Sequence, residues 1–166
     1  MQQAIFHTVL DAALIGTAAT AFLDAVSVVR ARLFGGPMPD YAPVGRWLAS
    51  MPRGRFVHAT IAKSPPIAGE RAIGWIAHYL TGIAFAGALV ALWPAWPREP
   101  TLLPALIVGI GSVAAPFLLM QPGMGLGVAA SRTPDPAAAR RRSLITHAIF
   151  ALGLYAAGWM ASAIPF

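Results

Sequence analysis

Residues 72–93 read AIGWIAHYLTGIAFAGALVALW, a stretch of 22 residues that contains no Asp, Glu, Lys or Arg. The hydrocarbon core of a bilayer is crossed by roughly 20 apolar residues in an α-helix. Three further stretches of similar character lie at about 5–29, 102–121 and 143–163. Backbone groups cannot stay unpaired in lipid, so we expect each stretch to be helical. The sequence therefore predicts an all-α, integral membrane four-helix bundle, formed as a single domain over residues 1–166.

The composition agrees with a membrane protein. Hydrophobic residues make up 57% of the chain and charged residues 11%, whereas a soluble domain carries about 25% charged residues. So few charged side chains cannot cover a water-exposed surface, which excludes a soluble globular enzyme, a disordered chain and a nucleic-acid-binding module. The sequence has no cysteine, which excludes disulfides, thiolate metal ligands and cysteine nucleophiles.

The 12 Lys and Arg residues are distributed unevenly. Seven lie at 30–71, between the first and second spans, and four lie at 122–142, between the third and fourth. Arg98 is the remaining one, in the short loop between the second and third spans. Basic loops of membrane proteins stay on the cytoplasmic side. We therefore expect both long loops to be cytoplasmic and both termini to lie outside, in a multi-pass membrane protein.

The first basic loop contains a short amphipathic segment at about 41–51. Asp40 is suited to cap its N-terminus. Val44, Trp47 and Leu48 would then share one apolar face of a helix. Because Trp beside basic residues is typical of membrane-surface anchors, we expect a short interfacial helix on the inner leaflet.

The two halves of the chain resemble each other weakly. Each half reads as an inward-running span, a basic loop and an outward-running span. A His follows the last Arg of each loop by a turn or two, at His78 and His147. This pattern is typical of two parallel helical-hairpin repeats.

Ionisable side chains within the predicted spans are the main functional signal. On insertion scales such a group costs about 2.5–3.5 kcal/mol at mid-helix, so it usually has a function. Asp24, His78 and His147 lie within a few residues of the cytoplasmic end of their spans, and Met120 and Gln121 end the third span. With a rise of about 1.5 Å per residue, all four helices place a polar or sulfur group in one layer near the cytoplasmic side.

The first hypothesis is that this layer binds or transports a small solute or an ion. The carboxylate would supply charge, and the imidazoles would bind the ligand or relay protons. The predicted ligand-binding residues are Asp24, His78, Gln121, His147, Thr20 and Ser27. A transition-metal version of the site would use Asp24, His78, His147 and Met120 as ligands.

Three alternatives remain open at this point. The chain could be a membrane enzyme that acts on a lipid or isoprenoid head group at the inner leaflet, held by Arg132, Arg140, Arg141 and Arg142. The two imidazoles could instead be the axial ligands of a haem. The layer could also be a purely structural polar network. In each case we expect contact with membrane lipid and none with nucleic acid, and the small-residue helix faces suit a homo-oligomer.

Several specific stretches resemble a known family. They are GRWL at 45–48, PRGRF at 52–56, GER at 69–71, HY at 78–79, FLLMQPGMG at 117–125, AASRTP at 129–134, and the late His147. Together they are similar to an uncharacterised, domain-of-unknown-function family of small bacterial integral membrane proteins. The resemblance covers nearly the whole chain and implies a multi-pass protein of the bacterial inner membrane with four spans. It implies no activity and no functional residues.

Overall fold

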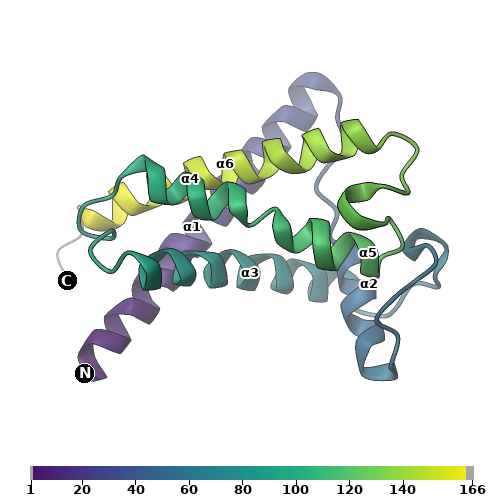
Figure 1. The fold of residues 1–166 in the computed structure, drawn as a ribbon, viewed down its shortest axis with the longest axis horizontal. Helices are drawn as coiled ribbons and strands as arrows, with labels where there is room; N and C mark the ends of the chain where they lie inside the picture. The colour runs from purple at the N-terminus through teal and green to yellow at the C-terminus, as the bar shows by residue number, and fades with distance from the viewer. Residues whose placement is uncertain (1, 164–166) are drawn as a thin grey trace. The chain divides into compact units, whose positions relative to one another are not determined.

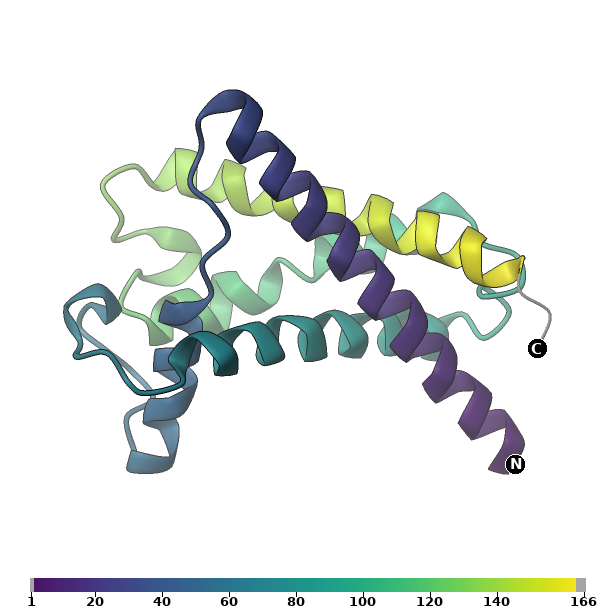
Figure 2. The same cartoon turned by 180° about the vertical axis from the view of Figure 1, so that it is seen from behind.

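The computed structural model describes residues 2–163. The long helices are α1 (Gln2–Phe34), α3 (Glu70–Leu92), α4 (Leu102–Gly111) and α6 (Pro136–Ser162), drawn in Figures 1 and 2. Shorter elements are α2 (Ala42–Ser50), η1 (Met51–Arg53), η2 (Ile61–Lys63), η3 (Pro116–Met120), α5 (Gln121–Gly123) and η4 (Val128–Ala130). The described residues include no strand. The prediction of an all-α protein is confirmed.

Four helical stretches of the described chain are long and apolar enough to cross a membrane. They are Phe6–Phe34, Glu70–Leu92, Leu102–Gly123 and Pro136–Ser162, and each contains most of one predicted span. The last begins seven residues earlier than predicted, because Asp135 Oδ1 accepts a hydrogen bond from the amide of Ala138 at 2.9 Å and caps the helix. The arginines at 140–142 therefore lie in the first turns of α6 rather than in a loop.

The third of these stretches is not a regular helix. Pro116 has no amide hydrogen, so it cannot bond to the carbonyl of Ser112. The helix is interrupted at residues 112–113, and a π-helical turn follows at Pro116–Met120. The helix is thus distorted just before Pro116, where Ser112 faces a neighbouring polar group.

The chain divides into two compact units. Unit 1 comprises Met1–Met38, Tyr79–Ser112 and Thr146–Phe166. Its apolar core is formed by Ile15, Ala19, Leu23, Ala86, Leu89, Trp96, Ala105, Phe150, Leu154 and Ala157. Small residues let the helices approach closely: Gly16 of α1 lies against the backbone of Ile83, and Gly109 of α4 lies against Ala151. Four helices thus contribute to one core in this unit.

Unit 2 comprises Pro39–His78 and Val113–Ile145. Helix α2 occupies most of the predicted segment at 41–51, and Asp40 Oδ1 accepts a hydrogen bond from the amide of Ala42 at 3.0 Å. The Trp47 side of α2 packs within the unit, because the indole lies against Gly123 and its Nε1 donates to the carbonyl of Phe56 at 2.8 Å. Trp47 stays half-buried in this contact, and the interfacial position of the helix remains a prediction.

Candidate functional site

The most distinctive polar group of unit 1 joins α6 to the end of α4. His147 Nδ1 lies 2.7 Å from Ser112 Oγ and 3.3 Å from the carbonyl oxygen of Gly109. Ser112 is 5% exposed, and its hydroxyl donates to the Gly109 carbonyl at 2.6 Å. An imidazole, a hydroxyl and a carbonyl are thus brought together where the third apolar stretch is interrupted.

The contacts around Nδ1 favour one neutral tautomer of His147. The Ser112 hydroxyl is within donating distance of the Gly109 carbonyl, which leaves Ser112 Oγ able to accept from His147. We therefore assign the hydrogen of the neutral ring to Nδ1, where it faces Ser112 Oγ and the Gly109 carbonyl, and the lone pair to Nε2. Nε2 makes no hydrogen bond to any residue that the structure describes. It is therefore free to bind a proton or a hydrogen-bond donor.

A second polar pair in unit 1 joins α1 to α3. The Tyr79 hydroxyl donates a hydrogen bond to the Asp24 carboxylate. Thr20, one turn earlier on α1, is 1% exposed, and its hydroxyl donates to the carbonyl of Gly16 at 2.7 Å. Ser27 is half-buried and has no hydrogen bond within the described part of the chain. Of this predicted polar face, Asp24 is the member that binds a neighbouring helix.

The other residues of the predicted layer belong to unit 2. The His78 ring stacks on Tyr41, with ring centroids 4.0 Å apart. Gln121 is 6% exposed; its Nε2 lies 3.4 Å from Ser143 Oγ, and its Oε1 has no partner among the described residues. Met120 is half-buried in the π-helical turn. These side chains therefore have surroundings of their own within unit 2.

The transition-metal hypothesis is not supported. Among the residues that the structure describes, no group of three or more His, Asp or Glu side chains could hold a metal ion. The predicted set of Asp24, His78 and His147, with Met120 beside it, forms no such group. Asp24 contacts Tyr79 and His147 contacts Ser112, whereas the His78 ring stacks on Tyr41. The bis-His haem hypothesis stays a prediction.

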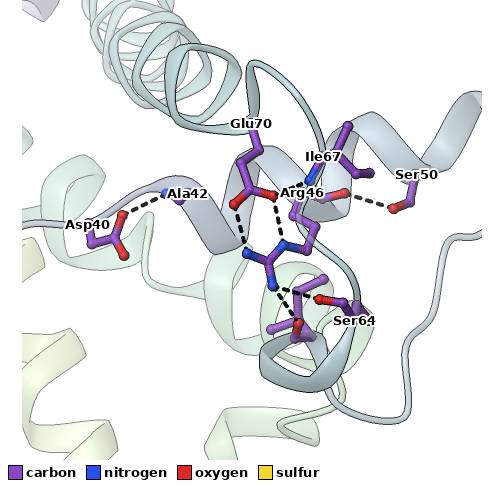
Figure 3. A network of polar contacts seen from close by, with 8 residues as sticks. Asp40, Ala42, Arg46, Ser50, Ser64, Ile67 and Glu70 are labelled. Carbon is purple, nitrogen blue, oxygen red and sulfur yellow. Dashed lines mark hydrogen bonds and ion pairs between the residues drawn. The ribbon is translucent and has the colours of Figure 1, made fainter.

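An ion pair that the sequence did not predict lies in unit 2 (Figure 3). Arg46 Nε and Nη2 donate to the two carboxylate oxygens of Glu70, both at 2.7 Å. Arg46 Nη1 donates to the carbonyls of Ile61 at 3.1 Å and Ser64 at 2.9 Å. Glu70 also accepts from the amide of Ile67 at 2.8 Å. The pair therefore ties α2 to the loop around η2 and to the first turn of α3.

The Arg46–Glu70 pair is well shielded from water. The two side chains are only 12% and 13% exposed. The hydrogen bond to Glu70 raises the pKa of the Arg46 guanidinium, a group that is charged at any physiological pH. Gly45, the neighbour of Arg46, lies directly against the backbone carbonyl of Glu70, where a side chain would not fit. This arrangement is that of a structural clamp.

The four arginines of the predicted head-group site are all exposed. Arg140 Nε donates to the carbonyl of Ala129 at 2.8 Å. Ala129 and Ala130 adopt positive φ angles of 47° and 59°, which non-glycine residues rarely adopt in succession. The amide of Arg132 donates to Leu126 at 2.8 Å and closes the same loop. One guanidinium of the set thus stabilises a strained loop, and the other three have no such contact within the described chain.

A family profile matches residues 13–161 of the chain. The protein belongs to DUF2938, a family of unknown function. The resemblance found in the sequence to a family of unknown function is thereby confirmed. Searches of curated proteins and of solved structures found no match.

Most of the stretches that suggested the family lie in unit 2 of this DUF2938 protein. Residues 45–48, 52–56, 69–71, 117–125 and 129–134 all belong to that unit. The stretch at 45–48 supplies Arg46 and Trp47, whose partners Glu70 and Gly123 lie in the stretches at 69–71 and 117–125. These stretches therefore build the unit, whereas His147 lies in unit 1.

Four residues of these sites were missed in the sequence. In the sequence, Arg46 was counted only among the basic residues that indicate the topology, and Glu70 was given no role. The two residues are 24 positions apart, and no local pattern links them. Ser112 carried one usable signal, its position four residues before Pro116. Tyr79 follows His78 directly, and its position within an apolar span gave no indication that its hydroxyl has a polar partner.

Proposed function

We propose that this DUF2938 protein is a membrane transport protein that moves a small polar solute or an ion in exchange for, or together with, protons. The observation that carries the proposal is the His147–Ser112–Gly109 arrangement, which leaves Nε2 of a half-buried imidazole without a hydrogen-bond partner among the described residues. Histidine gains and loses its proton near neutral pH, so it is suited to proton relay.

The cost of placing these groups in a span supports a functional role. An ionisable residue within a membrane helix costs a few kcal/mol to insert. Hydrogen bonds between membrane helices return on average only about 0.6 kcal/mol each. For Asp24 and His147, the free energy of insertion is therefore larger than the stabilisation by their hydrogen bonds to Tyr79 and Ser112.

The orientation of the protein belongs to the same proposal. Unit 2 contains nine of the 12 Lys and Arg residues. Basic segments next to membrane helices favour the cytoplasmic side. We place the basic segments between the spans, at 30–71 and 122–142, on the cytoplasmic side of the bacterial inner membrane, with the short loop around Arg98 and both termini outside.

The test uses the purified protein in liposomes that contain a pH-sensitive dye. Small solutes of several classes are added outside, namely monovalent cations, organic cations, amino acids, carboxylates and sugars. A transported solute that is coupled to protons changes the internal pH. We expect at least one class to do so with the wild type and with His7→Gln, an exposed histidine of α1, and not with His147→Gln.

Two results would contradict the proposal. One is a solute response that is unchanged in His147→Gln and Asp24→Asn. The other is no response to any class by folded protein, while His147→Gln lowers the thermal stability. That second result would make the polar pairs structural.

A further inference from the structure

The net charge of the protein lies entirely in unit 2. Unit 1 has three basic and three acidic residues, and unit 2 has nine basic and three acidic residues. The formal net charge of +6 is therefore the charge of unit 2 alone. A unit of this size with such an excess attracts anionic surfaces.

An ordered turn at the end of α2 projects from this unit. The amide of Gly54, at a φ of 74°, donates to the Met51 carbonyl at 2.9 Å. The amide of Arg55 donates to the Ser50 carbonyl at 3.2 Å. The carbonyl of Phe56 accepts from the Trp47 indole at 2.8 Å. The backbone of this turn is therefore fixed by its own hydrogen bonds.

The fixed turn presents apolar side chains to the exterior. Phe56 is 60% exposed and Val57 is 74% exposed. Arg53 and Arg55, on the same turn, are both exposed. Apolar side chains are suited to the acyl-chain side of the membrane interface, and guanidiniums are suited to its anionic head groups. This turn presents both kinds of side chain together.

We infer that the turn at residues 53–57 contacts the anionic surface of the bilayer, with Phe56 and Val57 entering the interface and Arg53 and Arg55 binding lipid phosphates. Charge complementarity selects this occupant, since the turn belongs to the unit that carries the whole net charge. This contact lies in the turn that follows the predicted interfacial helix, whose Trp47 packs against Gly123. The contact does not depend on the transport activity proposed above.

The natural absence of cysteine allows a direct test. Val57→Cys is labelled with an environment-sensitive fluorophore, and the whole protein is reconstituted in phosphatidylcholine alone or in equal parts of phosphatidylcholine and phosphatidylglycerol. A spin-labelled lipid that quenches near the head groups is included. The reference label is placed at Ala62→Cys, an exposed position of the same unit.

We expect the label at position 57 to be quenched strongly in the anionic bilayer and more weakly in phosphatidylcholine alone. Arg53→Gln with Arg55→Gln should abolish this difference. Lys63→Gln with Arg71→Gln removes the same charge from two other exposed positions of unit 2 and should leave it intact. The label at position 62 should be quenched little in either bilayer.

Three results would overturn the inference. A label at position 57 that stays as accessible to water as the one at position 62 places the turn in solvent. A label that is shielded but not quenched by lipid indicates a protein partner or a second copy of the chain. Equal loss of quenching in the two double variants indicates a general effect of net charge rather than a contact by this turn.

Discussion

Substitution of Gly16 by Ala tests the packing that positions the polar pairs of unit 1. A Cβ added at Gly16 would lie 2.5 Å from Ile83 Cα, 2.8 Å from Ile83 N and 2.9 Å from the Gly82 carbonyl oxygen. All three atoms belong to the backbone of α3, so no side chain can move aside. Helices α1 and α3 would have to separate, in the turn next to Thr20.

A matched control lies on the same pair of helices. A Cβ added at Gly87 would lie 3.6 Å from Ala12 Cβ, which is an ordinary contact. Both substitutions replace a helical glycine by alanine, so each gains about 0.8–1 kcal/mol of helix propensity. This gain cancels in the comparison. The difference then reports overpacking, for which about 1–3 kcal/mol is expected.

In the assay, the two variants and the wild type are unfolded in mild detergent, and the loss of the helical signal is monitored. We expect Gly87→Ala to be as stable as the wild type or more stable, and Gly16→Ala to be less stable than Gly87→Ala by about 1–3 kcal/mol. Equal stability of the two variants would refute the close α1–α3 packing and, with it, the position of the Asp24–Tyr79 pair.

Two further predictions concern the polar groups. Ser112→Ala and His147→Gln should each lower stability, and a double-mutant cycle should give a coupling of about 0.5–1.5 kcal/mol for their hydrogen bond; additive effects would show that the two side chains do not interact. Glu70→Gln should lower the melting temperature, because it leaves the shielded Arg46 guanidinium without a carboxylate partner. Arg46→Lys should also lower it, because an ammonium group cannot donate two parallel hydrogen bonds to a carboxylate as a guanidinium does. Glu99→Gln, at an exposed position of unit 1, is the control and should melt with the wild type.

The helices could be predicted because they depend on local properties. Hydropathy located all four long apolar stretches, and Asp40 marked the start of α2. The early start of α6 was missed because a hydropathy pattern excludes charged turns. Asp135, which caps that helix, was visible in the sequence and carried the missing signal.

The candidate site could be predicted only in part. Counting residues from the end of each span gave His147 and Asp24 a similar predicted depth, but depth along a helix does not say which neighbour a side chain meets. The imidazole meets Ser112 and the carboxylate meets Tyr79. The Arg46–Glu70 pair depends on the path of the first loop, which no periodic pattern describes.

The central claim is that His147 presents a free Nε2 within the membrane helices. Nitrogen-15 NMR of histidine-labelled protein in bilayers, at a pH where every imidazole is neutral, observes this directly. The His147 signals are assigned by their loss in His147→Gln. We predict a hydrogen on Nδ1 and a lone pair on Nε2, with a change of the Nδ1 signal in Ser112→Ala. A hydrogen on Nε2 of His147 in the wild type would contradict the account.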